Sequence, residues 1–351
     1  MATMDGLIWF ASFWVDGVGL GQAPSWVLGF QQVERVNRHL KGRLVAHTRQ
    51  GFNDQRIWCP TLGQRRDILV YLPPGYTPDK QYPLAIFLHG AAQDEQYFMQ
   101  GVVKSFDDAI SSGKIPPVIV AAPDGSIHGR ATLRDVASFW TDSKVGCFEQ
   151  YLMGDVWDFL FRNYSIEPKR ESHALMGVSM GGSAAMTLGI KHKDRVGMVI
   201  SIMPLLNLRH VDDAGRYRSP FDPDKAGLRV KAKLHESLGR RKLFMLRFNE
   251  LFSPIFGRGE EAISGMTRIN PLEVMIRENL QPNELQLFVG YGERDEYNVS
   301  AQAESFIYHA NQRGIEIQVI KDPRGRHDQA SGLRIFPEAI RWAAPLIPGP
   351  K

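Results

Sequence analysis

Short apolar runs alternate with amphipathic stretches along most of the chain, starting near residue 44. The run "LAIFL" at residues 84–88 is apolar at every position, as expected for a strand that is covered on both faces. Further apolar runs that predict strands lie at residues 118–122, 174–176, 196–202, 285–289 and 315–320. Patterns typical of helices lie between most of these runs, at residues 96–111, 148–163, 182–191 and 299–313.

This alternation predicts the fold class. Repeated strand–helix–strand units build a parallel sheet with helices on both faces, so we expect an α/β architecture with a mostly parallel central sheet. Two earlier runs, "RLVAHT" from Arg43 and "RRDILVYLPPGY" from Arg65, mix apolar and polar positions. Such mixed alternation is typical of edge or antiparallel strands.

One segment, residues 208–270, interrupts this rhythm between two predicted strands. It is long for a connection, so we interpret it as a cap-like insertion within the main domain. It carries 13 Lys and Arg residues against eight Asp and Glu residues. Its part at 232–252 has apolar residues at near-helical spacing, namely Leu234, Leu238, Leu243, Leu246 and Phe248. This spacing predicts a helix that lies on the domain with a solvated basic face, or a lid that lines the acyl or alcohol site.

Composition narrows the class of protein. With 351 residues, 43% hydrophobic and 23% charged, the chain is long enough for one large α/β domain with a sizeable core. Its formal net charge of +4 is mild and both signs are interspersed, so we expect no nucleic-acid partner. No apolar run is long enough to span a bilayer, so no membrane span is expected. The oligomeric state is not determined by the sequence.

Two features bear on the compartment without deciding it. Cys59 and Cys147 are the only cysteines, and we interpret them as buried free thiols rather than a disulfide pair. The N-terminal run at residues 7–15 has the length of a signal-peptide core, with a cleavage position after Ala23, but Asp5 precedes it where a basic residue would be usual. An apolar segment packed on the domain fits equally well, and without a signal the protein would be cytoplasmic.

A crowded glycine turn follows the run at residues 174–176. It has the pattern Gly177-x-Ser179-x-Gly181, in which glycines two residues before and after the serine remove Cβ atoms that would clash in a sharp reversal. This is the nucleophile-elbow pattern of α/β-hydrolases, where a serine hydroxyl is held clear of the sheet between a strand and a helix.

An acid and a histidine follow the serine at the ends of two later predicted strands. Asp295 lies in "GYGERDEYN" after the run at 285–289, and His327 lies in "DPRGRHDQ" after the run at 315–320. The order Ser179, Asp295, His327 is the chain order of α/β-hydrolases. Asp322 would follow the wrong strand for the acid, and Asp328 is too close to His327 in sequence to orient it easily.

Each of these residue types has a chemical role in ester cleavage. A serine hydroxyl becomes a nucleophile when a base such as His327 takes its proton, and Asp295 would fix the imidazole and balance its charge. The developing oxyanion needs two backbone N–H donors, for which we predict Met180, directly after the serine, and Ala91, in the loop after "LHG". No metal-binding or nucleotide-binding motif is present, so we expect neither a metal nor a cofactor.

The motifs "YLPPGY", "PLAIFLHG", "GVSMGGSAAM", "GYGERDEYN" and "GRHD" together resemble the esterase D / putative esterase family. That family includes feruloyl and acetylxylan esterases, S-formylglutathione hydrolase, siderophore esterases and mycolyltransferases. The resemblance covers roughly residues 43–342, excluding much of the insertion. It implies an α/β-hydrolase domain at 43–345, with an N-terminal extension at 1–42 and the cap or lid at 208–270.

Two functional classes follow. The first is a serine carboxylic-ester hydrolase that works through an acyl-enzyme. The resemblance implies feruloyl or acetyl esters of polysaccharides as substrates, with S-acyl thiols and small-molecule esters as alternatives. An acyltransferase would use the same triad, with an alcohol in place of water as acceptor. The second class is a non-catalytic binding protein on the same fold, which the presence of all three triad residues disfavours.

Overall fold

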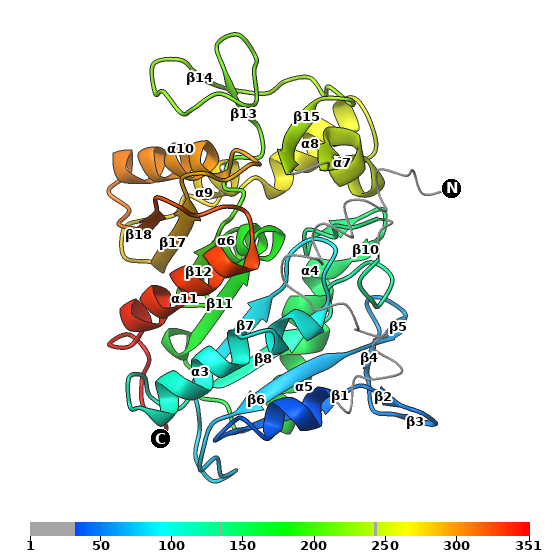
Figure 1. Ribbon diagram of the computed structural model, residues 1–351, viewed down its shortest axis with the longest axis vertical. Helices are drawn as coiled ribbons and strands as arrows, with labels where there is room; N and C mark the ends of the chain where they lie inside the picture. Colours follow the sequence, from blue (N-terminus) through cyan, green and yellow to red (C-terminus); the bar gives the residue numbers. More distant parts are fainter. Residues whose placement is uncertain (1–31, 133–134, 242–243) are drawn as a thin grey trace.

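An eight-stranded sheet forms the centre of the protein (Figure 1). The structure is a computed structural model that describes residues 32–132, 135–241 and 244–351. The strand order across the sheet is β1-β6-β8-β7-β11-β12-β17-β18. In chain order these strands are β1 Arg43–His47, β6 Ile68–Leu72, β7 Leu84–Leu88, β8 Ile119–Pro123, β11 His173–Val178, β12 Met198–Ile202, β17 Gln286–Gly292 and β18 Gln318–Asp322.

Strand direction follows the sequence pattern. Strands β8, β7, β11, β12, β17 and β18 are mutually parallel, whereas β1 pairs antiparallel with β6 and β6 antiparallel with β8. All five residues of β7 are buried, as its continuous apolar run predicted. The two runs with mixed alternation, by contrast, became the antiparallel strands at one edge of the sheet.

Helices cover both faces of the sheet, and the pleat of β7 shows how. Ile86 and Leu88 belong to one hydrophobic cluster and Ala85 and Phe87 to another, because successive side chains of a strand point to opposite faces. The first cluster includes residues of α5, α6, α9 and α10, and the second includes residues of α3 and α11. Their bounds are α3 Val102–Ser111, α5 Trp157–Asn163, α6 Met180–Lys191, α9 Pro271–Arg277, α10 Val299–Gln312 and α11 Gln329–Ala343.

Two predicted helices differ in detail from the uniform helices expected. The stretch 96–111 is divided into a 3₁₀ helix at Glu95–Met99 and α3, because Gly101 between them has φ of 103°. The stretch 148–163 is helical throughout, but α4 Phe148–Gln150 and α5 are joined by a π-helical segment at Tyr151–Val156.

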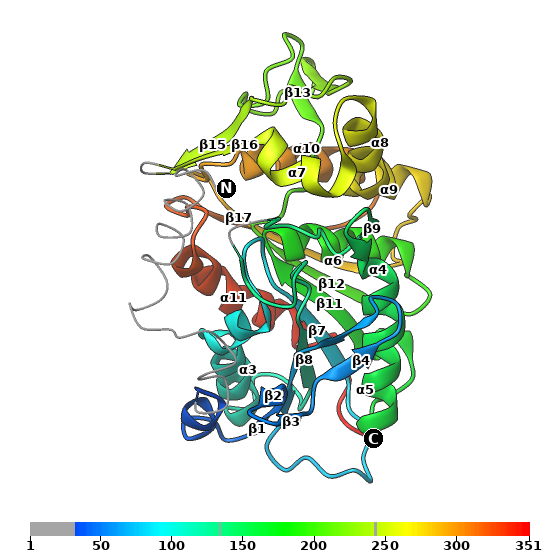
Figure 2. The same cartoon turned by 90° about the vertical axis from the view of Figure 1, so that its right-hand side faces the viewer.

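Residues 208–270 form a separate group of elements above the sheet (Figures 1 and 2). These elements are two hairpins, β13 His210–Asp212 with β14 Ala226–Leu228 and β15 Ser237–Arg241 with β16 Phe244–Arg247, and two helices, α7 Phe248–Phe256 and α8 Glu260–Ile269. In Figure 2 they lie over α6, at the end of the molecule toward which β12 runs.

The prediction of a single helix at residues 232–252 is wrong. Residues 237–241 and 244–247 pair as β15 and β16, and α7 begins only at Phe248, while Leu243 lies outside the described residues. The reason is a tertiary contact, since an added Cβ on Gly239 would lie 2.3 Å from Cδ1 of Tyr297. The backbone at Gly239 therefore docks directly on a loop of the main domain, and this docking outweighs the local helical spacing.

The remaining strands form short hairpins: β2 Arg49–Gln50 with β3 Asn53–Asp54, β4 Ile57–Cys59 with β5 Gln64–Arg66, and β9 Asp142–Ser143 with β10 Gly146–Cys147. Both cysteines are free thiols, Cys59 buried and Cys147 half-buried. The N-terminal run at 7–15 and Ala23 lie outside the described residues. Among the helices of the described ranges, none combines the length and the apolar character that crossing a membrane requires.

Candidate active site

Ser179 lies in a strained turn between β11 and α6. Its backbone has φ of 52° and ψ of −118°, a conformation that costs a non-glycine residue about 1–3 kcal/mol. A Cβ added to Gly177 would lie 2.4 Å from the backbone carbonyl carbon of Gly181, and one added to Gly181 would lie 2.0 Å from the carbonyl oxygen of Leu88. Only glycine fits at either position, so the two glycines permit the turn that raises the serine above the sheet.

The structure brings Ser179, His327 and Asp295 together from three distant parts of the sequence. Oγ of Ser179 lies 2.8 Å from Nε2 of His327, and Nδ1 of the same imidazole lies 2.7 Å from Oδ2 of Asp295. The Asp295 side chain is fully buried, and its Oδ1 accepts a hydrogen bond from the backbone N–H of Tyr297 at 2.8 Å. Both carboxylate oxygens therefore have a hydrogen-bond partner.

This chain of hydrogen bonds can activate a hydroxyl. When the Nδ1–H group of His327 donates a hydrogen bond to Asp295, Nε2 carries no proton and presents its lone pair to the Ser179 hydroxyl. The imidazole can then accept the hydroxyl proton, and the buried carboxylate stabilises the imidazolium that forms.

The nearby acids that compete in sequence serve other purposes. Asp322 forms an ion pair with Arg334 at 2.7 Å, and Asp328 caps α11 by accepting the backbone N–H of Ser331 at 2.9 Å. Glu296 was not singled out by the sequence analysis. Its Oε2 accepts the backbone N–H of His327 at 3.1 Å, so it ties the histidine loop to the loop that carries Asp295.

The two predicted oxyanion donors, Ala91 and Met180, both line the pocket that contains Ser179. Within the described ranges, neither backbone N–H donates a hydrogen bond to another group, so both are available to a ligand. The loop around Ala91 is held by its neighbours. The Ala92 N–H bonds to the carbonyl of Val136 at 2.7 Å, and the Gly90 N–H bonds to Oε1 of Gln93 at 2.7 Å.

His89 holds this loop in place through two hydrogen bonds of its ring. Its Nδ1 lies 2.8 Å from the carbonyl oxygen of Gly90 and donates to it, while Nε2 accepts the backbone N–H of Gly125 at 2.9 Å. Complete burial lowers the pKa of His89, which keeps the ring in the neutral form that this pattern of bonds requires. It therefore positions the loop without reaching the pocket.

The pocket above Ser179 is a narrow cavity of about 40 Å³. It is lined by Ala91, Phe139, Ser179, Met180, Leu205, Leu246, Leu251, Tyr297 and His327. Four of these residues, Phe139, Leu205, Leu251 and Tyr297, were not identified from the sequence, because no motif marks them. Leu246 was named only as part of a helix or lid, and both Leu246 and Leu251 come from the insertion.

Phe139 and Trp140 shape one wall and share an unusual backbone. Their φ angles are 50° and 51°, which bulky residues rarely adopt. The Phe139 N–H points to Sδ of Met180 at 3.3 Å, and Nε1 of Trp140 donates to the His89 carbonyl at 3.4 Å. These contacts hold Phe139 against the pocket.

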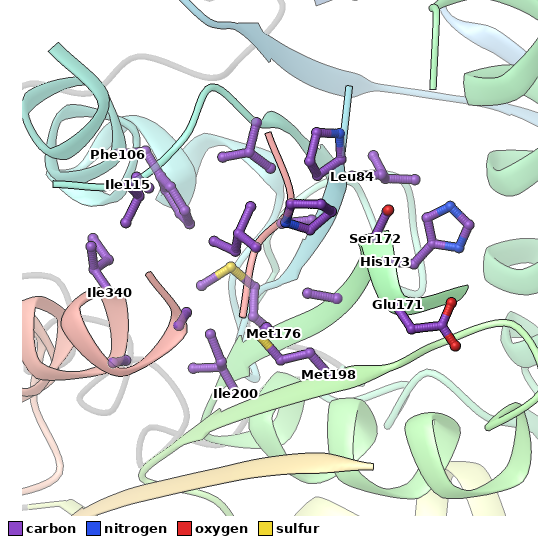
Figure 3. Close-up of a pocket in the computed structure, with 18 of the residues that line it drawn as sticks. Leu84, Phe106, Ile115, Glu171, Ser172, His173, Met176, Met198, Ile200 and Ile340 are labelled. Carbon is purple, nitrogen blue, oxygen red and sulfur yellow. The ribbon is translucent and has the colours of Figure 1, made fainter. Parts of the chain in front are cut away.

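A second apolar cavity, of about 30 Å³, lies at the opposite end of the sheet (Figure 3). Leu84, His173 and Met198, at the amino ends of β7, β11 and β12, contribute to its lining, together with Phe106 of α3 and Ile340 of α11. Ligands of open α/β sheets bind at the carboxyl ends of the strands, where Ser179 lies. This second cavity is therefore a gap in the packing between helices and sheet.

No arrangement of three or more His, Cys, Asp or Glu side chains suited to a metal ion occurs within residues 32–132, 135–241 and 244–351.

Comparison with known proteins identifies relatives of the whole domain. A sequence-family model described as "Putative esterase" matches residues 59–328. "Endo-1,4-beta-xylanase Y" of Acetivibrio thermocellus is 27% identical over 218 residues, which are 58% of this chain and 17% of that protein. The chain therefore aligns with less than a fifth of that relative's length.

Solved structures are similar over most of the chain. A ferulic acid esterase has a TM-score of 0.61 and 16% identity, with 88% of this chain and 99% of that chain covered. An S-formylglutathione hydrolase from Agrobacterium tumefaciens has a TM-score of 0.63 and 14% identity, with 88% and 97% covered. These similarities confirm the predicted α/β-hydrolase fold.

Proposed function

The chain belongs to this esterase family and is a carboxylic ester hydrolase, and we propose that it cleaves its substrate through an acyl-enzyme formed on Ser179. Membership of the family confirms the resemblance drawn from the sequence motifs. The catalytic residues in this proposal are Ser179, His327 and Asp295, with the N–H groups of Ala91 and Met180 as oxyanion donors.

In the acylation step, His327 takes the Ser179 proton on Nε2 while Oγ attacks the ester carbonyl carbon. The carbonyl oxygen becomes an oxyanion that accepts hydrogen bonds from the N–H groups of Ala91 and Met180. The tetrahedral intermediate then collapses, the C–O bond to the alcohol breaks, and His327 gives its proton to the leaving oxygen. In the deacylation step, His327 takes a proton from a water molecule, which attacks the acyl carbonyl carbon. The bond to Oγ then breaks, His327 returns the proton to Oγ, and the acid and free Ser179 are released.

The observation that carries this proposal is the continuous path Ser179–His327–Asp295, with donor–acceptor distances of 2.8 and 2.7 Å. A histidine with a purely structural role in the core is not expected to lie at hydrogen-bond distance from the hydroxyl of a strained serine. The two unoccupied N–H groups beside the same serine supply the second half of the machinery.

For the substrate, we propose feruloyl or acetyl esters carried by polysaccharides. The names of a similar solved structure, a ferulic acid esterase, and of a curated relative, a xylanase, support this class. Residues 43–345 would form the catalytic domain, with residues 208–270 as a cap on it. The cap position is supported by Leu246 and Leu251, which reach the pocket.

A fluorophosphonate probe tests the nucleophile directly, because it reacts with an activated serine hydroxyl. We expect the wild type to be labelled at Ser179, as located by mass spectrometry of peptides, and Ser179→Ala to be unlabelled and inactive on p-nitrophenyl acetate. Ser112→Ala, at an exposed serine on the far end of α3, is the matched control and should label like the wild type. Labelling at another serine, or full activity of Ser179→Ala, would refute the proposal.

A further inference from the structure

The pocket above Ser179 is built from two separate parts of the chain. Its floor consists of Ser179 and the oxyanion-loop residue Ala91, which belong to the main sheet domain. Its far side is closed by Leu246 at the end of β16 and Leu251 in α7, both from the insertion. We call Leu246 and Leu251 the roof of the pocket.

The roof is fastened to the oxyanion side of the site. Leu246 packs against Ala92, the residue after Ala91, whose backbone N–H is hydrogen-bonded to the carbonyl of Val136. Phe252, the neighbour of Leu251, is buried and stacks on Phe139 with ring centroids 5.4 Å apart. The roof therefore rests on the wall of the pocket itself.

The insertion is also fastened to the loop that carries the acid. The Tyr217 hydroxyl donates to the carbonyl of Tyr297 at 2.8 Å, and Nδ2 of Asn298 donates to the carbonyl of Tyr217 at 2.6 Å. Tyr217 is buried, and Nε2 of Gln302 donates to its hydroxyl at 2.8 Å. The insertion is therefore attached to the main domain at two places, at Phe139 and at the loop that carries Asp295.

The space left under the roof is small and apolar. An aromatic ring the size of benzene occupies a cavity of roughly 150 Å³, whereas the volume here is about 40 Å³. An acetyl methyl group fits such a space, whereas a hydroxycinnamoyl group is larger than it. The side chains above the nucleophile, Phe139, Leu205, Leu246 and Leu251, favour an apolar group over a charged one.

We propose that Leu246 and Leu251 determine acyl specificity by limiting the wild-type enzyme to short aliphatic acyl groups, chiefly acetyl. This inference rests on the proposed function, because it places the acyl group bound to Ser179 beneath the insertion. It assigns the choice between acetyl and feruloyl esters to two residues that take no part in bond breaking.

The test measures kcat/KM for p-nitrophenyl acetate, butyrate and ferulate, so that the leaving group is constant and only the acyl group changes. We expect the wild type to prefer acetate, and Leu246→Ala and Leu251→Ala each to raise the ferulate-to-acetate ratio at least tenfold. One excess methylene in a tight pocket already changes selectivity about 10- to 200-fold. Val230→Ala, at a residue 73% exposed in the same insertion, is the control and should keep the wild-type ratio.

Leu246 is half-buried, so we expect Leu246→Ala to fold better than Leu251→Ala. Leu246→Phe makes the opposite change, because it narrows the pocket, and it should lower the butyrate-to-acetate ratio. Near-UV circular dichroism checks that each variant is folded. A wild type that prefers ferulate, or ratios that do not move in folded variants, would overturn the assignment of the roof. Since Ser179→Ala tests the nucleophile independently, an inactive Ser179→Ala with unmoved ratios removes only this inference.

Discussion

At the scale of single residues, backbone strain collects around Ser179, the proposed nucleophile. Ala92, Phe139, Trp140, Ser179 and Met203 all have φ between 48° and 58°, a region that non-glycine residues rarely enter. Hydrogen bonds hold them there, for example from the Ser179 N–H to the carbonyl of Ile202 at 2.8 Å. Strained residues persist where the surrounding structure fixes them, and here they aim one hydroxyl and one wall at the same small space.

Among the proposed catalytic residues, the acid had the most competitors in the sequence. Replacing Asp295 by the neutral amide of similar shape tests its assignment. We expect Asp295→Asn to fold normally and to lower kcat by up to about 10⁴, because the amide fails to hold the required tautomer of His327 and removes the counter-charge. Steady-state kinetics on p-nitrophenyl acetate measures the loss. Asp322→Asn is the matched control and should stay within about twofold of the wild type, since Asp322 pairs with Arg334.

The reverse result, a large loss for Asp322→Asn and little for Asp295→Asn, would show that the acid is carried by β18 and not by the loop after β17.

At the scale of elements, the β15–β16 hairpin links the insertion to the acid loop by close backbone approach. A Cβ on Gly239 would lie 2.4 Å from the carbonyl oxygen of Glu296 and 2.3 Å from the ring of Tyr297. Glu296 in turn holds the backbone of His327, so the hairpin rests on residues adjacent to the triad. The insertion and the catalytic loops are therefore expected to respond together to a change in this contact.

Gly239→Ala tests that contact by overpacking it. Inserting a methyl group into a tight contact costs about 1–3 kcal/mol, so the hairpin should open about 5- to 150-fold more often. Hydrogen exchange of amides in residues 237–241 and 244–247 should accelerate accordingly, and kcat/KM should change with it. Gly227→Ala is the control in the other hairpin, where the nearest atom to an added Cβ is 3.9 Å away.

Slow exchange in Gly239→Ala equal to that of Gly227→Ala would mean that the hairpin tolerates the methyl group and does not depend on this close approach.

At the scale of the whole molecule, a group of acids lies beneath the oxyanion loop. Arg66 and Asp124 form a fully buried ion pair at 2.9 Å, and Glu95 is buried nearby. Burial, followed by repulsion from Asp94, Asp67 and Asp124, raises the pKa of Glu95 well above its usual range. The folded protein therefore holds a proton on Glu95 that the unfolded chain releases at lower pH.

This difference predicts how stability depends on pH. The contribution of protonated Glu95 is complete below its unfolded pKa of about 4.3 and is lost as pH rises toward the raised folded pKa, by up to about 1.4 kcal/mol per pH unit. Glu95→Gln removes the titration, so its free energy of unfolding relative to the wild type should increase between pH 5 and pH 8. Urea denaturation at both values measures this, with Glu316→Gln at an exposed position as control.

A Glu95→Gln variant whose stability follows the wild type at both pH values would show that Glu95 is ionised in the folded protein.

The sequence by itself determined the features that depend on local pattern. Apolar runs located six strands of the sheet, and the two runs of mixed alternation located the antiparallel strands β1 and β6, because burial of a strand shows in the pattern of its own residues. Gly177, Ser179 and Gly181 could be identified because the steric limits of one sharp turn involve only a few neighbouring residues. Asp295 and His327 were predicted as site residues from the rule that functional side chains collect at strand ends, and the structure places both in one hydrogen-bonded chain with Ser179.

Only the tertiary structure decided the features that depend on contacts between distant segments. The helix predicted at 232–252 became a hairpin because Gly239 docks on Tyr297, a residue 58 positions away, and no local spacing encodes that contact. The pocket wall at Phe139 and the contribution of Leu251 could not be found from the sequence for the same reason, and Leu246 was expected only as part of a helix or lid. A nucleophile is specified by the strain of its own turn, whereas the volume above it is set by whichever side chains the rest of the chain brings there.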